Sequence, residues 1–434
     1  MCPLKGGVIA ADDSGTVAAL GEFGLIAALS TWLPPAPRAE VGIGDDAAVL
    51  AVPDGRVVAA TDLLLEGRHF RRDWSSATDV GRKAAARSLV DIAAMGAVPS
   101  ALLVALAAPG DLPVSWARDL VAGLAAECAR AGASVIGGDT ARASSVLLAV
   151  TGLGDLAGRA PVRRSGAAPG DLVAVAGPLG HAAAGLALLA AGLELSAGLH
   201  GPLVAAQRRP APPYDAGPEA SGLGATAMID ISDGLLADLG HIADASGVLI
   251  NVASARLRPG EPLLAAARAV QGACRHADSA RTDSGARRGP ADSRPAGAPS
   301  SQAESSQAPS SQAPSSRAQS SRAPSSRAPS SRAPSSRAPA PRAQSSRAQS
   351  SQAQSSEAQS SQAQSSQAQS SQAPSFQALR WVLAGGEDHS LAATFPPGVA
   401  LPSRWTVIGE VRPGRGVVVD GQPWAEAVGW DHFA

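Results

Sequence analysis

Carboxylates stand beside glycines and apolar runs at several points of this chain, and the run Val41–Leu50 shows the pattern most clearly. In it, Gly42 and Gly44 precede the adjacent Asp45 and Asp46, and an apolar stretch follows. Adjacent carboxylates repel one another, and burial without compensation is costly for them. The run therefore predicts a cation site, although by itself it is equally well explained by a solvated turn in which one Asp caps the backbone.

Two repeats of this design lie in the first half of the chain. Residues 56–62 form an expected apolar strand that ends in Thr61 and Asp62, and residues 134–140 form another in which Asp139 follows two glycines. Ligand groups sit at strand ends in many α/β folds, and hydroxyl and carboxylate oxygens are hard ligands. Both strands are therefore expected to deliver oxygen ligands to a common site.

A predicted helix at 78–95 carries a further acid, Asp91, on the stripe that should face the core. A carboxylate in that position needs a partner. Either an ion pair with Arg82 or Arg87 satisfies it, or it joins the other acids at a cation.

Two more repeats lie in the second half. Asp230 ends an apolar strand, and Ser232 or Asp233 is expected to be the N-cap of the helix that follows. A helix N-terminus beside carboxylates can hold an anionic phosphate through its free N–H groups. Glu387 follows two glycines and an apolar run, 379–384, that we expect to be a fifth strand.

If the fold brings these acids together, divalent cations must offset their repulsion. Ligation by oxygen alone favours Mg²⁺ or Mn²⁺, and Mg²⁺ is commonly shared between carboxylates and substrate phosphates. Several ions imply a polyphosphate, so the pattern predicts phosphoryl transfer from a nucleotide. The chain has neither a GxxxxGK[ST] loop nor the motifs of protein kinases. Metal ions and glycine-rich turns must therefore hold the nucleotide.

The bulk composition excludes several classes of protein. The chain has 434 residues, 45% of them hydrophobic, and a formal net charge of −1. This balance gives no argument for binding nucleic acid or a membrane. The three cysteines are scattered without a CxxC pair, and no apolar run is long enough to span a bilayer. We expect a cytoplasmic protein.

Strands and helices alternate, which predicts an α/β (α+β) fold of two domains. We expect a flexible N-terminus at 1–20, a first domain at 21–158, and a second domain formed by 159–271 and 376–434. Residues 272–375 contain a five-residue repeat of Ser, Ala, Gln, Arg and Pro with almost no large apolar side chain. Such a segment cannot bury enough surface to offset the entropy of ordering, so we expect a disordered insertion.

These motifs, taken in order, resemble those of the thiamine-monophosphate kinases, which have the fold of aminoimidazole-ribotide synthetase. The resemblance rests on the following segments: GIGDDAA at 42–48, Thr61-Asp62, SLVDIAAMGA at 88–97, IGGDT at 136–140, RSGA at 164–167, IDISDGL at 229–235 and GGEDH at 385–389. It implies a homodimer whose N-terminal domains pair. It also implies that the chain passes the γ-phosphoryl group of ATP to the phosphate of thiamine monophosphate, with several Mg²⁺ ions and no protein nucleophile.

The resemblance further implies roles for individual residues. The implied Mg²⁺ ligands are Asp46, Thr61, Asp62, Asp91, Asp139, Asp230 and Asp233. The implied ATP contacts are Gly138, Asp139, Arg164 and Ser232. The implied contacts to thiamine monophosphate are His69, Glu387 and Trp430, and the cationic thiazolium ring suits a carboxylate and an aromatic face.

Some features depart from the family pattern or leave alternatives open. Ala60 stands where a small hydroxyl is common, His389 stands where an aromatic is common, and either Arg163 or Arg164 could be the ATP contact. A sister enzyme that makes selenophosphate or a ribotide is the nearest alternative. A non-catalytic scaffold that uses the repeat for interactions is the alternative from another class.

Overall fold

The computed structural model describes residues 15–43, 47–193, 198, 200–286, 374–426 and 429, and for residues 277–286 it describes the backbone alone. Contacts divide the chain into two compact units, one made of residues 1–280 with 368–434 and the other of 281–367. Every side chain discussed below belongs to the first unit.

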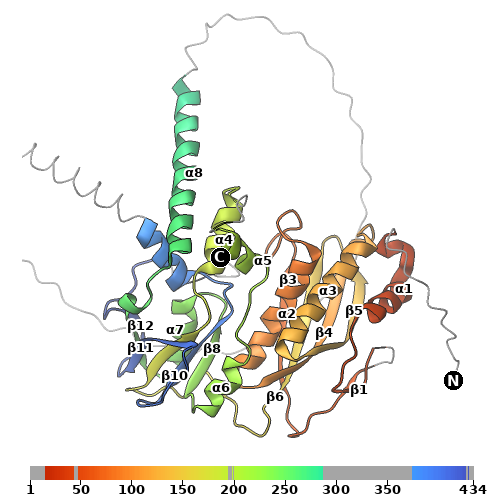
Figure 1. Cartoon of the computed structure of the whole chain (residues 1–434), viewed down its shortest axis with the longest axis horizontal. Helices are drawn as coiled ribbons and strands as arrows, with labels where there is room; N and C mark the ends of the chain where they lie inside the picture. The colour runs from red at the N-terminus through yellow and green to blue at the C-terminus, as the bar shows by residue number, and fades with distance from the viewer. Residues whose placement is uncertain are drawn as a thin grey trace, which may run out of the picture. The chain divides into compact units, whose positions relative to one another are not determined.

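The first half of this unit contains a four-stranded sheet in the order β3-β6-β4-β5 (Figure 1). Its strands are β3 (Val58–Leu65), β4 (Val98–Ala108), β5 (Ser134–Arg142) and β6 (Leu147–Asp155). Strands β4 and β5 are parallel, and β6 is antiparallel to β3 and β4. Strands β3 and β5 are therefore the two edges of this sheet. A short antiparallel pair, β1 (Ala39–Val41) and β2 (Val49–Leu50), precedes it.

Three helices accompany this sheet: α1 (Val17–Trp32), α2 (Ala77–Ala94) and α3 (Val114–Ala131). Helices α2 and α3 pack closely because each contributes a glycine to the contact. A Cβ atom on Gly81 would lie 2.1 Å from the carbonyl oxygen of Leu120, and one on Gly123 would lie 2.2 Å from that of Thr78. Only glycine allows this approach.

The second half contains a six-stranded sheet in the order β12-β9-β11-β7-β10-β8. Its strands are β7 (Leu172–Ala176), β8 (Ala227–Ile231), β9 (Leu249–Val252), β10 (Ser390–Phe395), β11 (Trp405–Arg412) and β12 (Gly416–Val419). The helices are α4 (His181–Ala190), α5 (Gly201–Arg208), α6 (Ala216–Gly222), α7 (Leu235–Ser246), the 3-10 turn η1 (Ser254–Arg256), α8 (Glu261–Ala286) and an unlabelled helix at 374–384. This mixture confirms the predicted α/β class.

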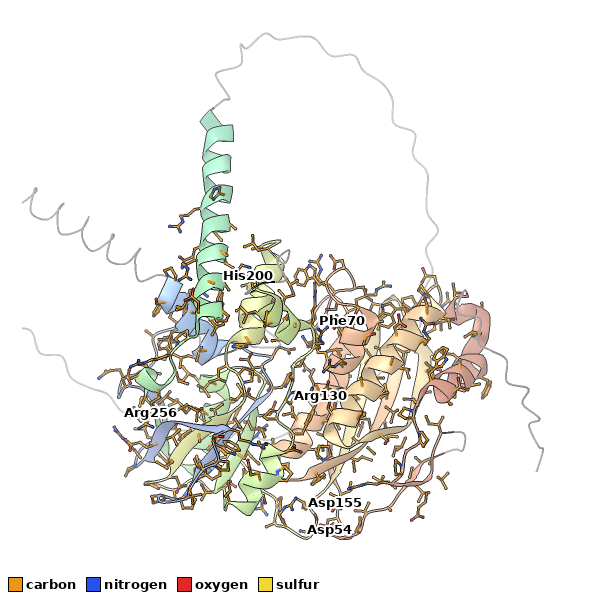
Figure 2. All side chains as sticks on the ribbon, in the orientation of Figure 1. Asp54, Phe70, Arg130, Asp155, His200 and Arg256 are labelled. Carbon is orange, nitrogen blue, oxygen red and sulfur yellow. The ribbon has the colours of Figure 1, made fainter. Side chains whose placement is uncertain are left out.

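Apolar packing is continuous between the two sheets. One buried cluster includes Leu64 and Leu102 from the first sheet and Phe395 from the second. Helix α2 contacts β3, β4 and β6 on one side and β8 and α6 on the other (Figure 1). Helix α2 is thus placed to present side chains toward both sheets. A second link between the two halves lies near the end of α3, where the guanidinium of Arg130, labelled in Figure 2, lies 6.0 Å from the ring of Tyr214.

Two expected boundaries differ from the structure. Helix α1 begins at Val17, inside the stretch 1–20 that we expected to be flexible. Of the described residues within 272–375, residues 272–286 continue helix α8 and residues 374–375 open the next helix. The repeat at 300–373 lies outside the described residues. The division into domains stays a prediction.

The expected strand at 379–384 is wrong, because these residues belong to the helix at 374–384. Ala378, Trp381 and Val382 are buried at the i, i+3, i+4 spacing of a helix that packs one face against the core. The strand of this region, β10, begins after the two glycines and not before them. Within the described residues, no helix combines the length and the apolarity needed to cross a bilayer.

Candidate functional site

Three of the predicted acids converge where α2 lies between the two sheets. Asp62 comes from β3, Asp91 from α2 and Asp230 from β8. The carboxyl group of Asp91 interacts electrostatically with those of Asp62 and Asp230, and it is hydrogen-bonded to Asp62. The Ser88 hydroxyl also donates to Asp62 Oδ2, at 3.3 Å. We call Asp62, Asp91 and Asp230 the acid cluster.

The acid cluster lacks enough positive charge of its own. Burial raises the pKa of Asp91 to about 9, and repulsion from Asp230 and Asp62 adds to this effect. Nδ1 of His389 lies 3.5 Å from Asp230 Oδ2, and both residues are buried. Arg87 lowers the pKa of Asp91 only partly. Carboxylates that are desolvated and crowded in this way have the chemistry of a divalent-cation site.

On the other side of Arg87, positive charge is plentiful. Glu387 forms ion pairs with Lys83 Nζ at 2.8 Å and with Arg87 Nη1 at 2.5 Å. Burial by itself would raise the pKa of the Glu387 carboxyl, but Lys83 and Arg87 outweigh it and hold that pKa well below its ordinary range. Nη2 of Arg87 lies 3.7 Å from Asp62 Oδ1, so this one guanidinium links Glu387 to the acid cluster.

A cavity of about 500 Å³ adjoins Glu387. Its lining includes four predicted site residues, His69, Ser232, Asp233 and Glu387. The remaining lining residues are Arg68, Ala183, Leu186, Gln207, Gln377, Arg380, Trp381, Ala384, Gly385, Gly386 and Gly429. This volume suits a small organic molecule. The fold thus brings a cavity with one strong carboxylate next to the acid cluster.

Backbone contacts hold the two loops of this cavity together. The N–H of Glu387 donates to the carbonyl of Ser232 at 2.7 Å, and the N–H of His389 donates to that of Ile231 at 2.8 Å. A Cβ atom on Gly386 would lie 2.6 Å from the Ser232 carbonyl oxygen. The glycine is therefore required for this approach. Glu387 itself has a φ of +71°, a strained value that places its side chain toward α2.

Two further acids anchor these loops. Asp388 accepts backbone N–H bonds from Gly180 at 2.5 Å and Ala182 at 2.8 Å, at the N-terminus of α4. Asp238, in the first turn of α7, accepts from the N–H groups of Ser232, Asp233 and Gly234, each at 3.1 Å. This corrects the expected cap: Gly234 is the N-cap residue and has no side chain, and an acid inside the helix accepts from the N–H groups of the three residues that precede the helix.

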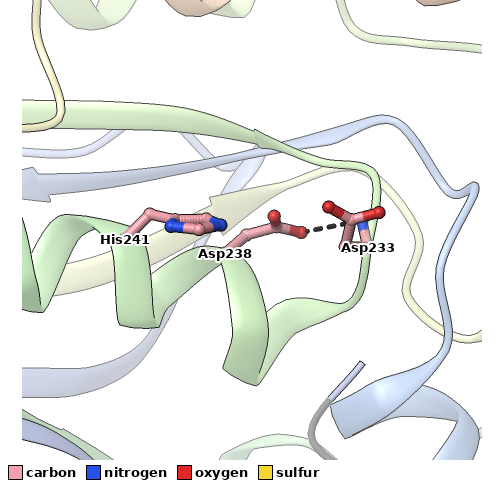
Figure 3. A group of neighbouring side chains, drawn as sticks. All are labelled: Asp233, Asp238 and His241. Atoms are coloured by element: carbon pink, nitrogen blue, oxygen red, sulfur yellow. Dashed lines mark hydrogen bonds between the residues drawn. The ribbon is translucent and has the colours of Figure 1, made fainter. Parts of the chain in front are cut away.

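Asp233, Asp238 and His241 form a second group with metal-ligating atoms, all within 4.8 Å of one another (Figure 3). Figure 3 shows the carboxylate of Asp238 engaged with the backbone of Asp233. Asp238 Oδ2 already accepts hydrogen bonds from three N–H donors, so the main role of this group is to hold the loop before α7 in place.

Other predicted residues lie apart from the acid cluster. Asp139 is exposed on β5, at the opposite edge of the sheet from Asp62, and register places three strand spacings between them. That is a separation of roughly 14 Å within one chain. A Cβ atom on Gly138 would lie 1.9 Å from the carbonyl oxygen of Val104, so this glycine serves strand packing.

Three more predicted or alternative site residues lie at differing positions, and two others fall outside the part of the chain that the structure describes. Thr61 is beside Asp62 on β3, and its hydroxyl lies 3.0 Å from that of Thr151. Arg164 is exposed and its carbonyl accepts from Ser246 Oγ, whereas Arg163 lines a separate cavity. Asp46 and Trp430 lie outside the described residues.

The sequence interpretation missed Lys83, Asp238 and Asp388. A buried lysine on a helix face carries no local signal except its rarity in this chain. Asp238 has the signature of an acid in the first turn of a helix, a position that favours negative charge. Asp388 directly follows Glu387, and its role as an acceptor for backbone N–H groups has no separate signal in the sequence.

Comparison with known proteins bears on identity. The family described as AIR synthase related protein, N-terminal domain, matches residues 44–156. A thiamine-monophosphate kinase of Mycobacterium tuberculosis is 46% identical over 265 residues, which cover 60% of this chain and 78% of the relative. The crystal structure of thiamine-monophosphate kinase from Stenotrophomonas maltophilia K279a matches with a TM-score of 0.59 at 25% identity, covering 92% of this chain and 96% of that one.

A further solved structure, AaThiL complexed with AMPPCP and TMP, has a TM-score of 0.59 at 26% identity and covers 96% of this chain and 98% of that chain. The likeness thus extends over both sheets, and it confirms the expected aminoimidazole-ribotide synthetase-like fold. This chain belongs to the thiamine-monophosphate kinase family.

Proposed function

We propose that this protein is an ATP-dependent phosphotransferase that converts thiamine monophosphate to thiamine diphosphate. In the reaction, a phosphate oxygen of thiamine monophosphate attacks the γ-phosphorus of ATP, the bond from that phosphorus to the bridging oxygen breaks, and ADP leaves. The observation that carries the proposal is the acid cluster, linked through Arg87 to Glu387 in the wall of the cavity. AaThiL, which was solved with AMPPCP and TMP, supports it.

The acid cluster is the proposed Mg²⁺ site. Asp62, Asp91 and Asp230 fit this ion because they are desolvated oxygen ligands whose crowding raises the pKa of Asp91. Thr61 adds a hydroxyl on the same strand. Bound Mg²⁺ would neutralise the charge that develops on the phosphoryl group. Asp233 and Asp46 are proposed as further ligands, and the number of ions is open to measurement.

The cavity is the proposed place of the acceptor substrate. Glu387 offers a carboxylate to the cationic thiazolium ring, and His69 lies on the same wall. Ser232, next to the start of α7, is proposed to contact ATP, as are Gly138, Asp139 and Arg164. Trp430 is proposed to contact thiamine monophosphate; its neighbour Gly429 lines the cavity. The chain's own groups bind and orient the substrates, and no side chain acts as a nucleophile.

A homodimer and a cytoplasmic location are also proposed. Leu63, on the edge strand β3, is 52% exposed. A large apolar side chain in that position is consistent with a face that another subunit covers.

The test is incubation of the full chain with ATP, Mg²⁺ and thiamine monophosphate. The expected products are thiamine diphosphate and ADP in equal amounts, separated by chromatography. Thiamine without its phosphate serves as the matched acceptor control and should give no product. A folded protein that makes ADP only with a different acceptor, such as selenide or a ribotide, would replace the proposal with a sister activity.

A further inference from the structure

Lys83 is buried in the middle of helix α2, with a side chain 2% exposed. Its ammonium group meets three oxygen atoms: the carbonyl of His69 at 3.1 Å, the carbonyl of Gln207 at 3.1 Å and the Glu387 carboxylate at 2.8 Å. A buried cation is costly unless it is paired and hydrogen-bonded. Here two carbonyls accept hydrogen bonds from the ammonium group, and one carboxylate supplies the counter-charge.

The chemical choice at this position is informative. Of the 36 Lys and Arg residues in the chain only two, Lys5 and Lys83, are lysines. Arginine carries a planar fork of donors, whereas an ammonium is a compact charge with three donors in a tetrahedral arrangement. Three oxygens from three separate residues within 3.1 Å of one nitrogen suit a compact ammonium better than a planar fork. The composition is thus strongly biased to arginine. The lysine at position 83 stands where three oxygens surround a single nitrogen.

The three oxygens come from three separate segments. His69 follows strand β3, Gln207 lies in helix α5, and Glu387 lies in the loop before β10. All three residues line the cavity of about 500 Å³, and Lys83 itself does not. The ammonium therefore lies behind the wall and ties its parts together.

We propose that Lys83 is a positioning residue that fixes the acceptor side of the site. It holds Glu387 in one orientation and sets the spacing between the His69 wall and the Gln207 wall. This inference rests on the proposed function for the identity of the substrate. It predicts a much larger effect on thiamine monophosphate than on ATP, because the three tethered residues line the cavity and none of them belongs to the acid cluster.

Steady-state kinetics of four variants test the proposal: Lys83→Met, Lys83→Arg, Glu387→Gln and the double variant of Lys83→Met with Glu387→Gln. Lys83→Met should raise KM for thiamine monophosphate by roughly 10- to 100-fold, since small displacements of a binding wall have effects of this size. KM for ATP should change by less than about 2-fold. Lys83→Arg should raise KM for thiamine monophosphate less than Lys83→Met does, because arginine keeps the positive charge but does not reproduce the compact ammonium group.

The double variant tests whether Lys83 acts through Glu387. If it does, the double variant should match Glu387→Gln to within about 2-fold, because residues that act as a unit are not additive. Losses that multiply, or an equal rise in both KM values, would overturn the proposal. If Lys83→Met does not fold, the double variant removes both charges together and keeps the test available. Arg82 lies on the same helix as Lys83 and pairs with Glu127. Arg82→Met is therefore the matched control and should leave both KM values unchanged.

A measurement without turnover separates this proposal from the proposed function. Acetylation of lysine, followed by mass spectrometry, should modify Lys83 at least about 10-fold more slowly in the folded chain than in the unfolded chain. Glu387→Gln should speed the modification. Equal rates in folded and unfolded chains would overturn the tether, whether or not the protein makes thiamine diphosphate.

Discussion

Two carboxylate environments lie on either side of Arg87, and they are organised in opposite ways. On one side, the acid cluster of Asp62, Asp91 and Asp230 has more negative than positive charge, and burial with repulsion raises the pKa of Asp91 to about 9. On the other side, Glu387 has two cations, Lys83 and Arg87, and the pKa of its carboxyl is held low.

The difference shows which part of the site is complete without a ligand. The charge of Glu387 is neutralised by side chains of the protein itself, so this wall of the cavity is formed before substrate arrives. The charge of the acid cluster is neutralised only by an added cation, because desolvated carboxylates repel one another. The same type of side chain therefore stabilises the fold in one place and opposes it in the other.

The largest expected effect is loss of turnover in Asp91→Asn. Removing a metal-binding carboxylate should lower kcat by roughly 10²–10³-fold, the range seen when one group that stabilises transition-state charge is lost. The same change should raise the Tm of the metal-free protein at neutral pH by about 2–6 °C, since Asp91 must take up a proton on folding and asparagine does not. Steady-state kinetics and thermal unfolding in a chelator measure the two effects.

Asp119→Asn is the matched control, because Asp119 is a half-exposed acid on α3 that pairs with Arg118. It should change neither kcat nor Tm. A fall in Tm for Asp91→Asn would contradict the charge excess that we assign to the acid cluster.

Glu387→Gln should destabilise the protein, whereas Asp91→Asn should stabilise its metal-free form. Neutralising Glu387 leaves Lys83 and Arg87 without their shared counter-charge, and breaking a buried pair costs about 3 kcal/mol. Unfolding in urea measures this loss. An unchanged free energy of unfolding would mean that the Glu387 side is no more complete than the acid cluster.

The pH dependence of stability should follow from three acids. The pKa is raised to about 9 for Asp91, about 8 for Asp238 and about 7 for Asp388. The ordinary value is 3.8, so between about pH 5 and pH 8 the unfolded chain has released protons that the folded chain keeps. Metal-free stability should fall as pH rises through this window.

Urea unfolding in a chelator and in saturating Mg²⁺ separates the contributions. Mg²⁺ should stabilise the protein more at about pH 8 than at about pH 5.5, because protons compete with the ion at Asp91. Stabilisation by Mg²⁺ that is equal at both values would place the ion away from the acid cluster.

The smallest effect on activity is expected for Arg87→Met, although this variant should also lose stability because it breaks the buried pair with Glu387. Arg87 Nη2 lies 3.7 Å from Asp62 and repels an incoming cation. Removing it should lower the Mg²⁺ concentration for half-maximal activity by about 2- to 5-fold. Titration of activity with Mg²⁺ measures the shift, and a higher requirement in the variant would show that Arg87 assists the ion.

Much of the site follows from local sequence patterns. Asp62 and Asp230 follow apolar residues of their strands and Asp91 lies on a helical stripe, so each was recognisable as a carboxylate beside a buried run. The expected strand ends are wrong, because β3 continues past Asp62 to Leu65 and β8 continues past Asp230 to Ile231. The family resemblance supplied the roles of His69 and Glu387, which line one cavity.

The remainder depends on tertiary structure. The apolar run at 379–384 fits a buried strand or a buried helix equally well, and the choice is made by packing of Trp381 and Val382. Lys83 acquires its partners from segments up to 304 residues away along the chain, which no local pattern encodes. Asp139 lies at the opposite sheet edge from Asp62 because of strand order, which spacing in the sequence does not reveal.

The central claim is that Asp62, Asp91 and Asp230 together hold a divalent cation. The most direct test is an anomalous-scattering map from crystals of the full chain grown with Mn²⁺ and a non-hydrolysable ATP analogue. We predict a peak about 2.1–2.3 Å from a carboxylate oxygen of each of the three residues. A well-ordered nucleotide with Mn²⁺ peaks only elsewhere, for example beside Asp233 and His241, would contradict the claim.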